Sequence, residues 1–532
     1  MTRPRYGDLY FGLSDSRNEA NQDRDSFLQT YVDLNGSTKR VVRGDKFLVL
    51  GPKGTGKSAL AWYLQFAEPE GAHLALVRDA SSLPLAEVPR LQTGQEPGPE
   101  RTVVAWKFIL LCNYLELLMR DQGCSINRNP EVVRVARLLR DFGFMGDASG
   151  RALLKFSTTT VTIPVPKLGT IYKRESSSAL NIFNLIPYLE MWVAEAESAV
   201  RHILLIDGLD SIFLNDAKYD ESLSSLVQAA YTLNQKLMEN RATGSVVLLL
   251  RNDIFSRIAL SLPDSQKMRD DLALELDWRV LSGKAGVGAP LMRLVNTKAG
   301  RALGVDNFEV LKYFPDSIEV GSRELGVRKI PTFQYLLNMT RHTPRDMLRL
   351  FEEIRRVEAS GIFEESGDRL RQEVIHEGVL QYSTKYFVGA ISNEFAGYAG
   401  GPERAAAALT ALKAINKQSF DGDEFRESLA SVASGIEVDH RDLLRLLFYA
   451  GAIGNSIGGY REKSYMQFYH RRDESEIYLQ GNFMLHNALI HAWGLRRTLG
   501  NEPESQTGAI PLIDRGAARP RRRRRKWEER KK

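Results

Sequence analysis

Cysteine is scarce in this 532-residue sequence, and an apolar leader is missing. The two cysteines, Cys112 and Cys124, lie in an apolar segment with helical periodicity, and their spacing suits no zinc site. Two cysteines cannot build the disulfide framework of a small secreted protein. The start, MTRPRYGDLY, contains no signal-peptide core. We therefore expect a reduced, cytoplasmic protein with buried thiols.

Long uninterrupted hydrophobic runs are lacking as well. The longest apolar stretch, Val103 to Met119, contains Lys107, Asn113 and Glu116. We therefore expect a core helix there and no membrane span. No internal repeat is found, and the length leaves room for about two to four globular domains.

Charge is distributed unevenly along the chain. Residues 515–532 hold eight Arg, three Lys and two Glu, a net charge of +9, so the total of +6 leaves −3 for the rest. The nearly neutral body argues against a long basic channel for nucleic acid. Residues 515–532 are too polar to fold and can bind nucleic acid without sequence preference, but a solvated tail that aids solubility is an equally good interpretation.

A glycine-rich segment follows a short apolar run, Phe47 to Leu50, and precedes a helical pattern. The segment fits G-x-x-x-x-G-K-[ST], the Walker A phosphate loop. It consists of Gly51, Pro52, Lys53, Gly54, Thr55, Gly56, Lys57 and Ser58.

This spacing has a physical reason. Glycines let backbone N–H groups curl around a phosphate, and the following helix directs its positive N-terminus at the same anion. Lys57 would reach the β- and γ-phosphates, and the Ser58 hydroxyl would hold Mg²⁺. The segment therefore predicts a site for a nucleoside triphosphate, which we take to be ATP with Mg²⁺.

A second apolar run, Ile203 to Ile206, is typical of a central parallel strand. Asp207 follows it directly and is our candidate for holding Mg²⁺ through water. Many ATPases place Glu in the next position, but Gly208 stands there. Asp210 is therefore our candidate for the catalytic acid, with a helix cap as the alternative.

A third buried run ends in polar residues within 245–257, and a P-loop sheet has a strand here, beside the Asp207 strand. Asn252 or Arg251 at its tip would sense the γ-phosphate, and Asp253 could cap the next helix. Farther on, Arg345 opens a strong helical pattern and could fold back onto the γ-phosphate. A surface arginine on an ordinary helix is the competing interpretation.

These segments together resemble the AAA/STAND branch of P-loop ATPases in order and spacing, over roughly residues 8–360. Asp207-Gly208-Leu209-Asp210 is similar to the D-G-h-D box of NACHT-type STAND proteins. That box usually continues with an acid, whereas Ser211 stands here, which favours slow, switch-like hydrolysis over rapid turnover.

Two weaker similarities extend the resemblance. Phe11-Gly12, followed by Glu19, resembles the adenine-side box that precedes Walker A in this group. Thr343-Pro344-Arg345 resembles its sensor-2 segment. Bacterial STAND-like ATPases often serve in signalling or phage defence, and the resemblance implies such a role.

The C-terminal half reads as helices followed by a two-stranded ribbon, Ser464 to His470 and Glu476 to Leu479, and a last helix, Phe483 to Thr498. This order resembles a winged helix, which binds DNA or packs against protein. We favour packing against a protein partner or a second copy, because the candidate recognition helix has only Arg441 and Arg445 as basic residues.

The expected fold is an α/β P-loop NTPase with a parallel sheet and flanking helices, then a mainly helical lid and a winged-helix-like region. The expected parts are a base-covering segment 1–40, the ATPase core 41–280 with an inserted hairpin 151–174, the lid 281–365, the winged-helix-like domain 366–500 and the tail 501–532.

Two functions fit these patterns. The first is an ATP-dependent regulatory switch whose γ-phosphate biases the packing of the C-terminal helices. The second is a DNA-binding ATPase of the initiator or loader kind. A metabolic kinase is disfavoured, because no segment between the Walker boxes resembles a small-molecule acceptor site.

Overall fold

The computed structural model describes most of the chain. The described residues are 4–67, 73–83, 99–141, 143–146, 162–164, 179–209, 217–279, 289–305, 307–322, 326–364, 367–395, 398, 400–433, 439–457, 465–471 and 476–495. The expected tail and most of the expected hairpin at 151–174 lie outside these residues.

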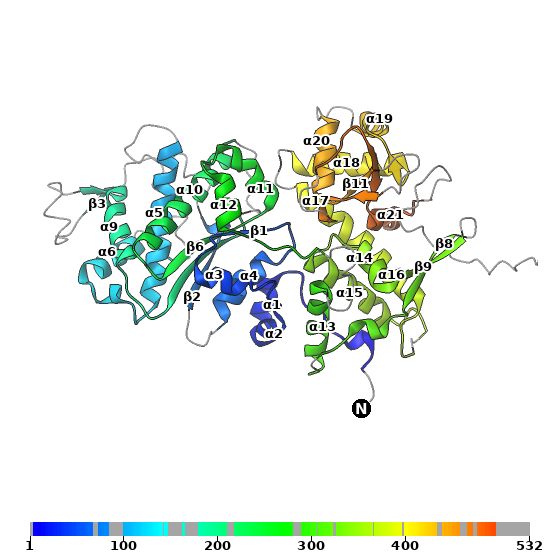
Figure 1. The fold of residues 1–532 in the computed structure, drawn as a ribbon, viewed down its shortest axis with the longest axis horizontal. Helices are drawn as coiled ribbons and strands as arrows, with labels where there is room; N and C mark the ends of the chain where they lie inside the picture. The colour runs from blue at the N-terminus through cyan, green and yellow to red at the C-terminus, as the bar shows by residue number, and fades with distance from the viewer. Residues whose placement is uncertain are drawn as a thin grey trace, which may run out of the picture.

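The centre of the structure is a five-stranded sheet in which all neighbouring strands are parallel (Figure 1). The strands, in spatial order, are β2 (His73–Asp79), β5 (Arg201–Asp207), β6 (Gly244–Leu250), β1 (Leu48–Leu50) and β7 (Ala273–Glu275). All the apolar runs expected as strands belong to this sheet, and β6 lies beside β5 as expected. The central residues of the strands are hydrophobic because helices cover both faces of a parallel sheet. The expected fold class is confirmed.

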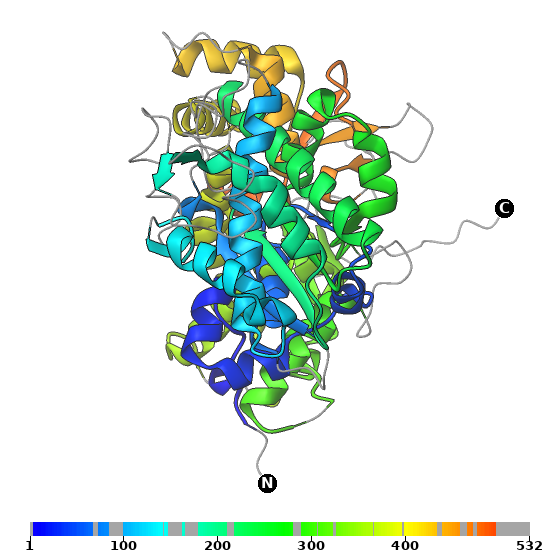
Figure 2. The same ribbon diagram turned by 90° about the vertical axis from the view of Figure 1, so that its left-hand side faces the viewer.

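Successive residues of each strand face two different cores. Leu48, Leu204 and Leu248 belong to one core, whereas Val49 and Leu205 belong to the other. The first core is covered by α5 (Pro99–Arg120), α6 (Pro130–Asp141), α9 (Ile186–Ala194), α10 (Ala217–Glu239), α11 (Asn252–Ile258) and α12 (Ser265–Leu272). Figure 2 shows this molecule from the side of α5 and α6, whose cyan ribbons lie toward the viewer.

The second core joins the sheet to the N-terminal segment and to the C-terminal half. Among the N-terminal helices, α3 (Ser37–Arg43) and α4 (Lys57–Phe66) contribute to this core, and α1 (Ser16–Gln22) and α2 (Arg24–Thr30) pack against α4. Helix α1 begins at Asp15, whose side chain accepts hydrogen bonds from two backbone N–H groups of the first turn. This capping satisfies donors that a helix end otherwise leaves unpaired.

Helix α5 tests the expectation of a core helix. Its residues Thr102–Arg120 are long and apolar enough to cross a membrane, but 78% of the most apolar window is buried inside the protein. Glu116, one of the polar interruptions, is buried in an ion pair with Arg78. The polar residues of α5 therefore have partners within the fold, as a core helix requires.

The lid region is less helical than expected. It contains the helices α13 (Pro290–Ala302), α14 (Thr332–Asn338) and α15 (Pro344–Ala359). An antiparallel hairpin, β8 (Ser317–Ser322) and β9 (Gly326–Pro331), projects between α13 and α14. In Figure 1 this hairpin extends away from the body of the molecule.

The C-terminal half combines helices with a four-stranded antiparallel sheet of order β10-β13-β11-β12. Its strands are β10 (Ser419–Phe420), β11 (Ile453–Ile457), β12 (Tyr465–Gln467) and β13 (Asn482–Leu485). Its helices are α16 (Gln372–Tyr382), α17 (Val388–Glu394), α18 (Gly401–Ile415), α19 (Gly422–Val432), α20 (His440–Tyr449) and α21 (Asn487–Trp493). A π-helical turn, Ser383–Phe387, joins α16 to α17.

The prediction of the ribbon was partly wrong. The strand at 465–467 was expected, but residues 476–479 form no strand, and the expected last helix begins with strand β13 instead. The Asn455 side chain explains the first error: its amide donates to the Tyr478 carbonyl and its oxygen accepts from the Tyr478 N–H. A side chain thus takes the place of a neighbouring strand at Tyr478.

Of the expected hairpin at 151–174, only residues 162–164 belong to the described part of the chain. They form β3 (Thr162–Pro164), which pairs antiparallel with β4 (Ala179–Asn181). The hairpin itself stays a prediction.

Candidate nucleotide-binding site

The phosphate loop lies between β1 and α4, where the sequence places it. Gly54 and Gly56 have φ values of 82° and 91°, in the left-handed region that side chains disfavour. A Cβ at Gly51 would lie 2.6 Å from Thr55 Oγ1, which itself donates to the Pro52 carbonyl at 2.8 Å. Each of these three glycines thus meets a local requirement of the loop.

Lys57 begins α4 and is buried inside the loop. Its ammonium donates to the Gly51 carbonyl at 2.9 Å and to the Pro52 carbonyl at 3.0 Å. Gly51 and Pro52 therefore serve the site through their backbone oxygens. The ammonium lies within the curl of the loop, where it can reach the β- and γ-phosphates of a nucleotide.

A cavity of about 220 Å³ opens from the loop. Its polar end is formed by loop residues 53–58, with Asp207 from the end of β5 and Arg345 from α15. Its apolar lining residues include Phe27 of α2, Leu294 of α13, Leu348 of α15, and Leu34 and Trp278 from the segments after α2 and β7. The cavity thus combines groups that suit phosphates with apolar side chains that suit a base.

Ser58 and Asp207 supply the oxygen atoms for a metal. Both line the cavity, one from the first turn of α4 and the other from the tip of β5. A hydroxyl and a carboxylate suit Mg²⁺, which is commonly bound through one or two protein oxygens together with water and substrate phosphates. Among the described residues, no group of three or more His, Cys, Asp or Glu side chains could hold a metal without such help.

The two residues that follow β6, Arg251 and Asn252, have different environments. Arg251 turns away from the loop and pairs with Asp253, with Nε–Oδ1 at 2.9 Å and Nη2–Oδ2 at 2.8 Å. The expectation that Asp253 caps α11 was wrong, because Arg251 is the capping residue and has no side-chain cap bond. Asn252 does not line the cavity, and its buried Oδ1 has no hydrogen-bond partner in the described part of the chain. Asp210 lies outside the described residues.

Arg345 connects the lid to the phosphate loop. Its backbone N–H donates to the Gly54 carbonyl at 3.3 Å, and its Nε donates to the Ser14 carbonyl at 3.2 Å. Helix α15 begins two residues earlier, at Thr343, whose hydroxyl accepts from the Asp346 N–H at 3.2 Å. The start of α15 is therefore packed against the loop, and Arg345 is half-buried where it lines the cavity.

Sequence reasoning missed one buried pair in the cavity. The Nζ atom of Lys298 on α13 lies 2.6 Å from Oε1 of Glu19 on α1, and it donates to the Thr30 hydroxyl at 3.3 Å. All three residues line the cavity. Glu19 belongs to the segment that resembles an adenine-side box, but no pattern around Lys298 distinguishes it from an ordinary helical lysine.

Comparisons with known proteins add only distant structural likenesses. No family model matches the chain, and no curated protein matches it. A solved structure of the Walker-type ATPase PABY2304 of Pyrococcus abyssi is 12% identical, covers 87% of this chain and 95% of its own, and has a TM-score of 0.36. The structure of Drosophila ORC bound to DNA is 12% identical, with 92% and 90% covered and a TM-score of 0.26.

Scores this low carry no functional argument, so the class rests on the chain itself. A parallel sheet carries a glycine-rich loop between β1 and α4, with an aspartate at the tip of β5, which is separated from β1 by β6. The protein therefore has the P-loop NTPase fold.

Proposed function

We propose that this chain binds ATP with Mg²⁺ and hydrolyses it slowly, as a nucleotide-dependent regulatory switch. The observation that carries the proposal is that Lys57, Ser58, Asp207 and Arg345 line one cavity. Lys57 and Arg345 neutralise phosphate charge, and Ser58 and Asp207 hold Mg²⁺ directly or through water.

The choice of ATP depends on the base end of the cavity. Glu19 lies there and belongs to the segment that resembles an adenine-side box. The N-terminal helices supply apolar walls for a flat base, as the base-covering interpretation of residues 1–40 requires.

Slow turnover and switching follow from two features. Ser211 stands where related boxes carry an acid, which leaves Asp210 to orient the attacking water. Arg345 belongs to the lid and contacts the loop, so a γ-phosphate would bias the position of α15.

Replacing Lys57 with Ala tests the proposal. The variant should lose ATP binding and turnover, because the Lys57 ammonium, held by the Gly51 and Pro52 carbonyls, is the group placed to neutralise the β- and γ-phosphates. Binding by calorimetry and phosphate release are measured for the wild type, for Lys57→Ala and for Lys39→Ala, an exposed control on α3 outside the cavity. Turnover in Lys57→Ala equal to that of the control would contradict the proposal.

The second candidate is a DNA-binding ATPase of the initiator or loader kind. The element order of the C-terminal half favours it: α18, β10, α19 and α20 precede β11 and β13, as in a winged helix. Against it, the exposed side of α20 carries Arg441 and an Asp442–Arg445 ion pair of 2.7 Å, which is little positive charge for a groove-reading helix.

One measurement separates the two candidates. ATP turnover is compared with and without added double-stranded DNA and RNA. Stimulation by nucleic acid favours the initiator or loader candidate, and unchanged turnover favours a switch that responds to a protein.

A further inference from the structure

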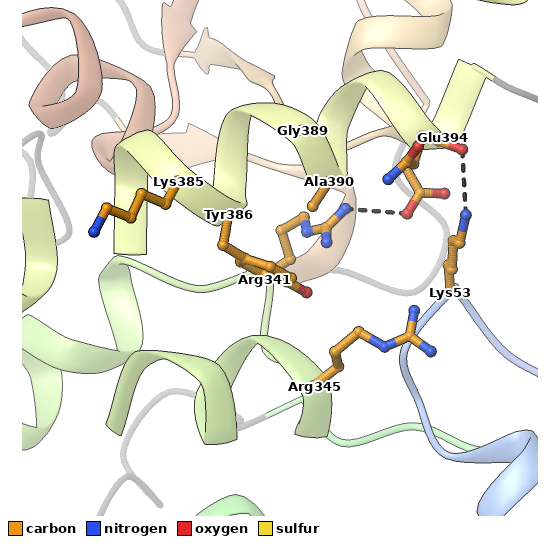
Figure 3. A pocket seen from close by; sticks show the side chains of 9 residues that line it. Lys53, Arg341, Arg345, Lys385, Tyr386, Gly389, Ala390 and Glu394 are labelled. Atoms are coloured by element: carbon orange, nitrogen blue, oxygen red, sulfur yellow. Dashed lines mark hydrogen bonds and ion pairs between the residues drawn. The ribbon is translucent and has the colours of Figure 1, made fainter. Parts of the chain in front are cut away.

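A single carboxylate joins the C-terminal half to both sides of the nucleotide site. Glu394, at the end of α17, contacts Arg251 Nη2 through Oε2 at 3.0 Å and Arg341 Nη1 through Oε1 at 3.1 Å. Arg251 directly follows β6, and Arg341 lies just before the lid helix α15. Figure 3 shows Arg341 pointing at Glu394, with Lys53 of the phosphate loop approaching the same end of α17.

Each arginine is also held by an aspartate of its own element. Arg251 pairs with Asp253, as described above, and Arg341 Nε lies 2.8 Å from Asp346 Oδ2. Burial alone would raise the pKa of both aspartates, but the adjacent arginine holds each pKa below its usual value. Both aspartates are therefore ionised at neutral pH.

The C-terminal half adds one hydroxyl to each of these pairs. Tyr398 donates to Asp253 Oδ2 at 3.0 Å, and Tyr386 donates to Asp346 Oδ1 at 2.8 Å. The result is two Arg–Asp–Tyr groups of the same chemistry, joined by Glu394. All five charged side chains are buried or nearly so, with exposures of 17% or less.

Burial makes this arrangement sensitive to the loss of one member. Glu394 is the one carboxylate of the group that both arginines share, and each arginine keeps an aspartate as its second partner. Removal of the Glu394 charge should therefore weaken the link between the two Arg–Asp pairs and let Arg251 and Arg341 shift relative to each other.

Two parts of the nucleotide site depend on the position of these groups. Arg345, which lines the nucleotide cavity, lies four residues after Arg341 in the chain. The second part is the phosphate loop, where Lys53 Nζ donates to the Asn393 carbonyl at 3.3 Å. The end of α17 thus contacts the loop and, through Arg341, the segment that carries Arg345.

We propose that Glu394 is a positioning residue for ATP hydrolysis: through Arg341 it holds Arg345 in register with the phosphate loop and couples it to the C-terminal half. This inference rests on the proposed ATPase function. It assigns no contact between Glu394 and the nucleotide, because Glu394 does not line the nucleotide cavity.

Glu394→Gln keeps the shape of the side chain and removes its charge. We expect kcat to fall about tenfold or more while the KM for ATP changes less than about twofold, because misplacement of groups by a fraction of an ångström mainly affects the transition state. A second readout is amide hydrogen exchange in 388–394, which Mg²⁺-ATP should slow in the wild type but not in the variant.

Glu116→Gln is the matched control. Glu116 is also a buried carboxylate between two arginines, at 2.6 Å from Arg78 and 2.7 Å from Arg120. It lies in the other core, away from the nucleotide cavity. Its loss should lower stability without changing kcat or the exchange response.

The outcomes distinguish this inference from the proposed function. A wild-type protein without turnover overturns the proposed function and this inference with it. Turnover in the wild type, together with unchanged kcat and exchange response in folded Glu394→Gln, overturns the inference alone. If Glu394→Gln does not fold, Tyr386→Phe decides: it removes one hydroxyl, and a lower kcat supports the inference while an unchanged kcat overturns it.

Discussion

Gly54 illustrates how much a single residue of this site must satisfy. Its φ of 82° suits glycine, and an added Cβ would lie 3.1 Å from Arg345 Cβ and 3.4 Å from Thr343 Oγ1. The first requirement comes from the loop, and the second comes from the lid. The glycine therefore allows both the curl of the backbone and the close approach of α15.

Asp210 is our candidate for the catalytic acid. If Asp210 orients the attacking water, the variant Asp210→Asn should bind ATP with little loss of affinity, while its kcat should fall about 10²-fold. The control is Asp220→Asn, for which ATP binding and single-turnover rates are also measured. Asp220 lies on α10, and in the wild type its Oδ1 pairs with Arg257 Nη2 at 2.7 Å. Loss of binding with unchanged turnover per bound nucleotide would assign Asp210 to helix capping instead.

At the scale of elements, the start of α15 determines where Arg345 lies. Pro344 occupies the first turn, where its missing N–H costs nothing, and Thr343 caps the helix. The cap fixes the first turn, and the first turn contacts the Gly54 carbonyl.

Thr343→Ala should therefore affect both stability and catalysis. We expect the free energy of unfolding to fall by about 1 kcal/mol, because the Asp346 N–H loses its acceptor. We also expect a lower kcat, since the first turn of α15 frays beside the loop. Urea unfolding and ATP turnover are compared with Thr343→Ser, which keeps the cap. Equal values for the two variants would show that the hydroxyl is not needed.

Hydrophobic periodicity was not enough to predict the boundary between strand β13 and helix α21. Strand β13 and helix α21 lie in a mainly apolar segment that was predicted as one helix from Phe483 to Thr498, although short apolar runs can form either a strand or a helix. The structure divides the segment at His486, whose side chain caps α21, because Asn482–Leu485 pair with β11 and with β10. The sheet partner decides the conformation, and that partner is remote in sequence.

At the scale of the whole molecule, the net charge of residues 515–532 differs in sign from that of the rest of the chain. The net charge of −3 outside residues 515–532 provides no general attraction for nucleic acid, whereas those residues carry +9. Any affinity for DNA that is independent of sequence should therefore depend on the tail.

Deletion of residues 515–532 tests this dependence. The affinity for double-stranded DNA should fall at low salt, and the dependence of binding on salt concentration should become shallower, because fewer phosphates are neutralised. The control carries a neutral Gly/Ser segment of the same length in place of the tail and should behave like the deletion. Equal affinity of the full chain and both variants would place the binding site in the body.

The sequence alone determined the phosphate loop and the strands that carry it. The loop conformation depends on glycines and a lysine within eight consecutive residues, and the apolar runs Phe47 to Leu50 and Ile203 to Ile206 indicate the strands that carry the site. Such features are local, so a motif and a hydrophobic run were enough to predict them.

Only the tertiary structure decided which distant residues complete the site. Lys298 meets Glu19 across 279 positions, and Glu394 joins Arg251 to Arg341 from a third segment. No local pattern encodes these contacts, because each depends on how whole helices pack against the sheet. A charged side chain that is buried needs an oppositely charged or hydrogen-bonding partner. The buried environment that creates this need exists only in the folded chain.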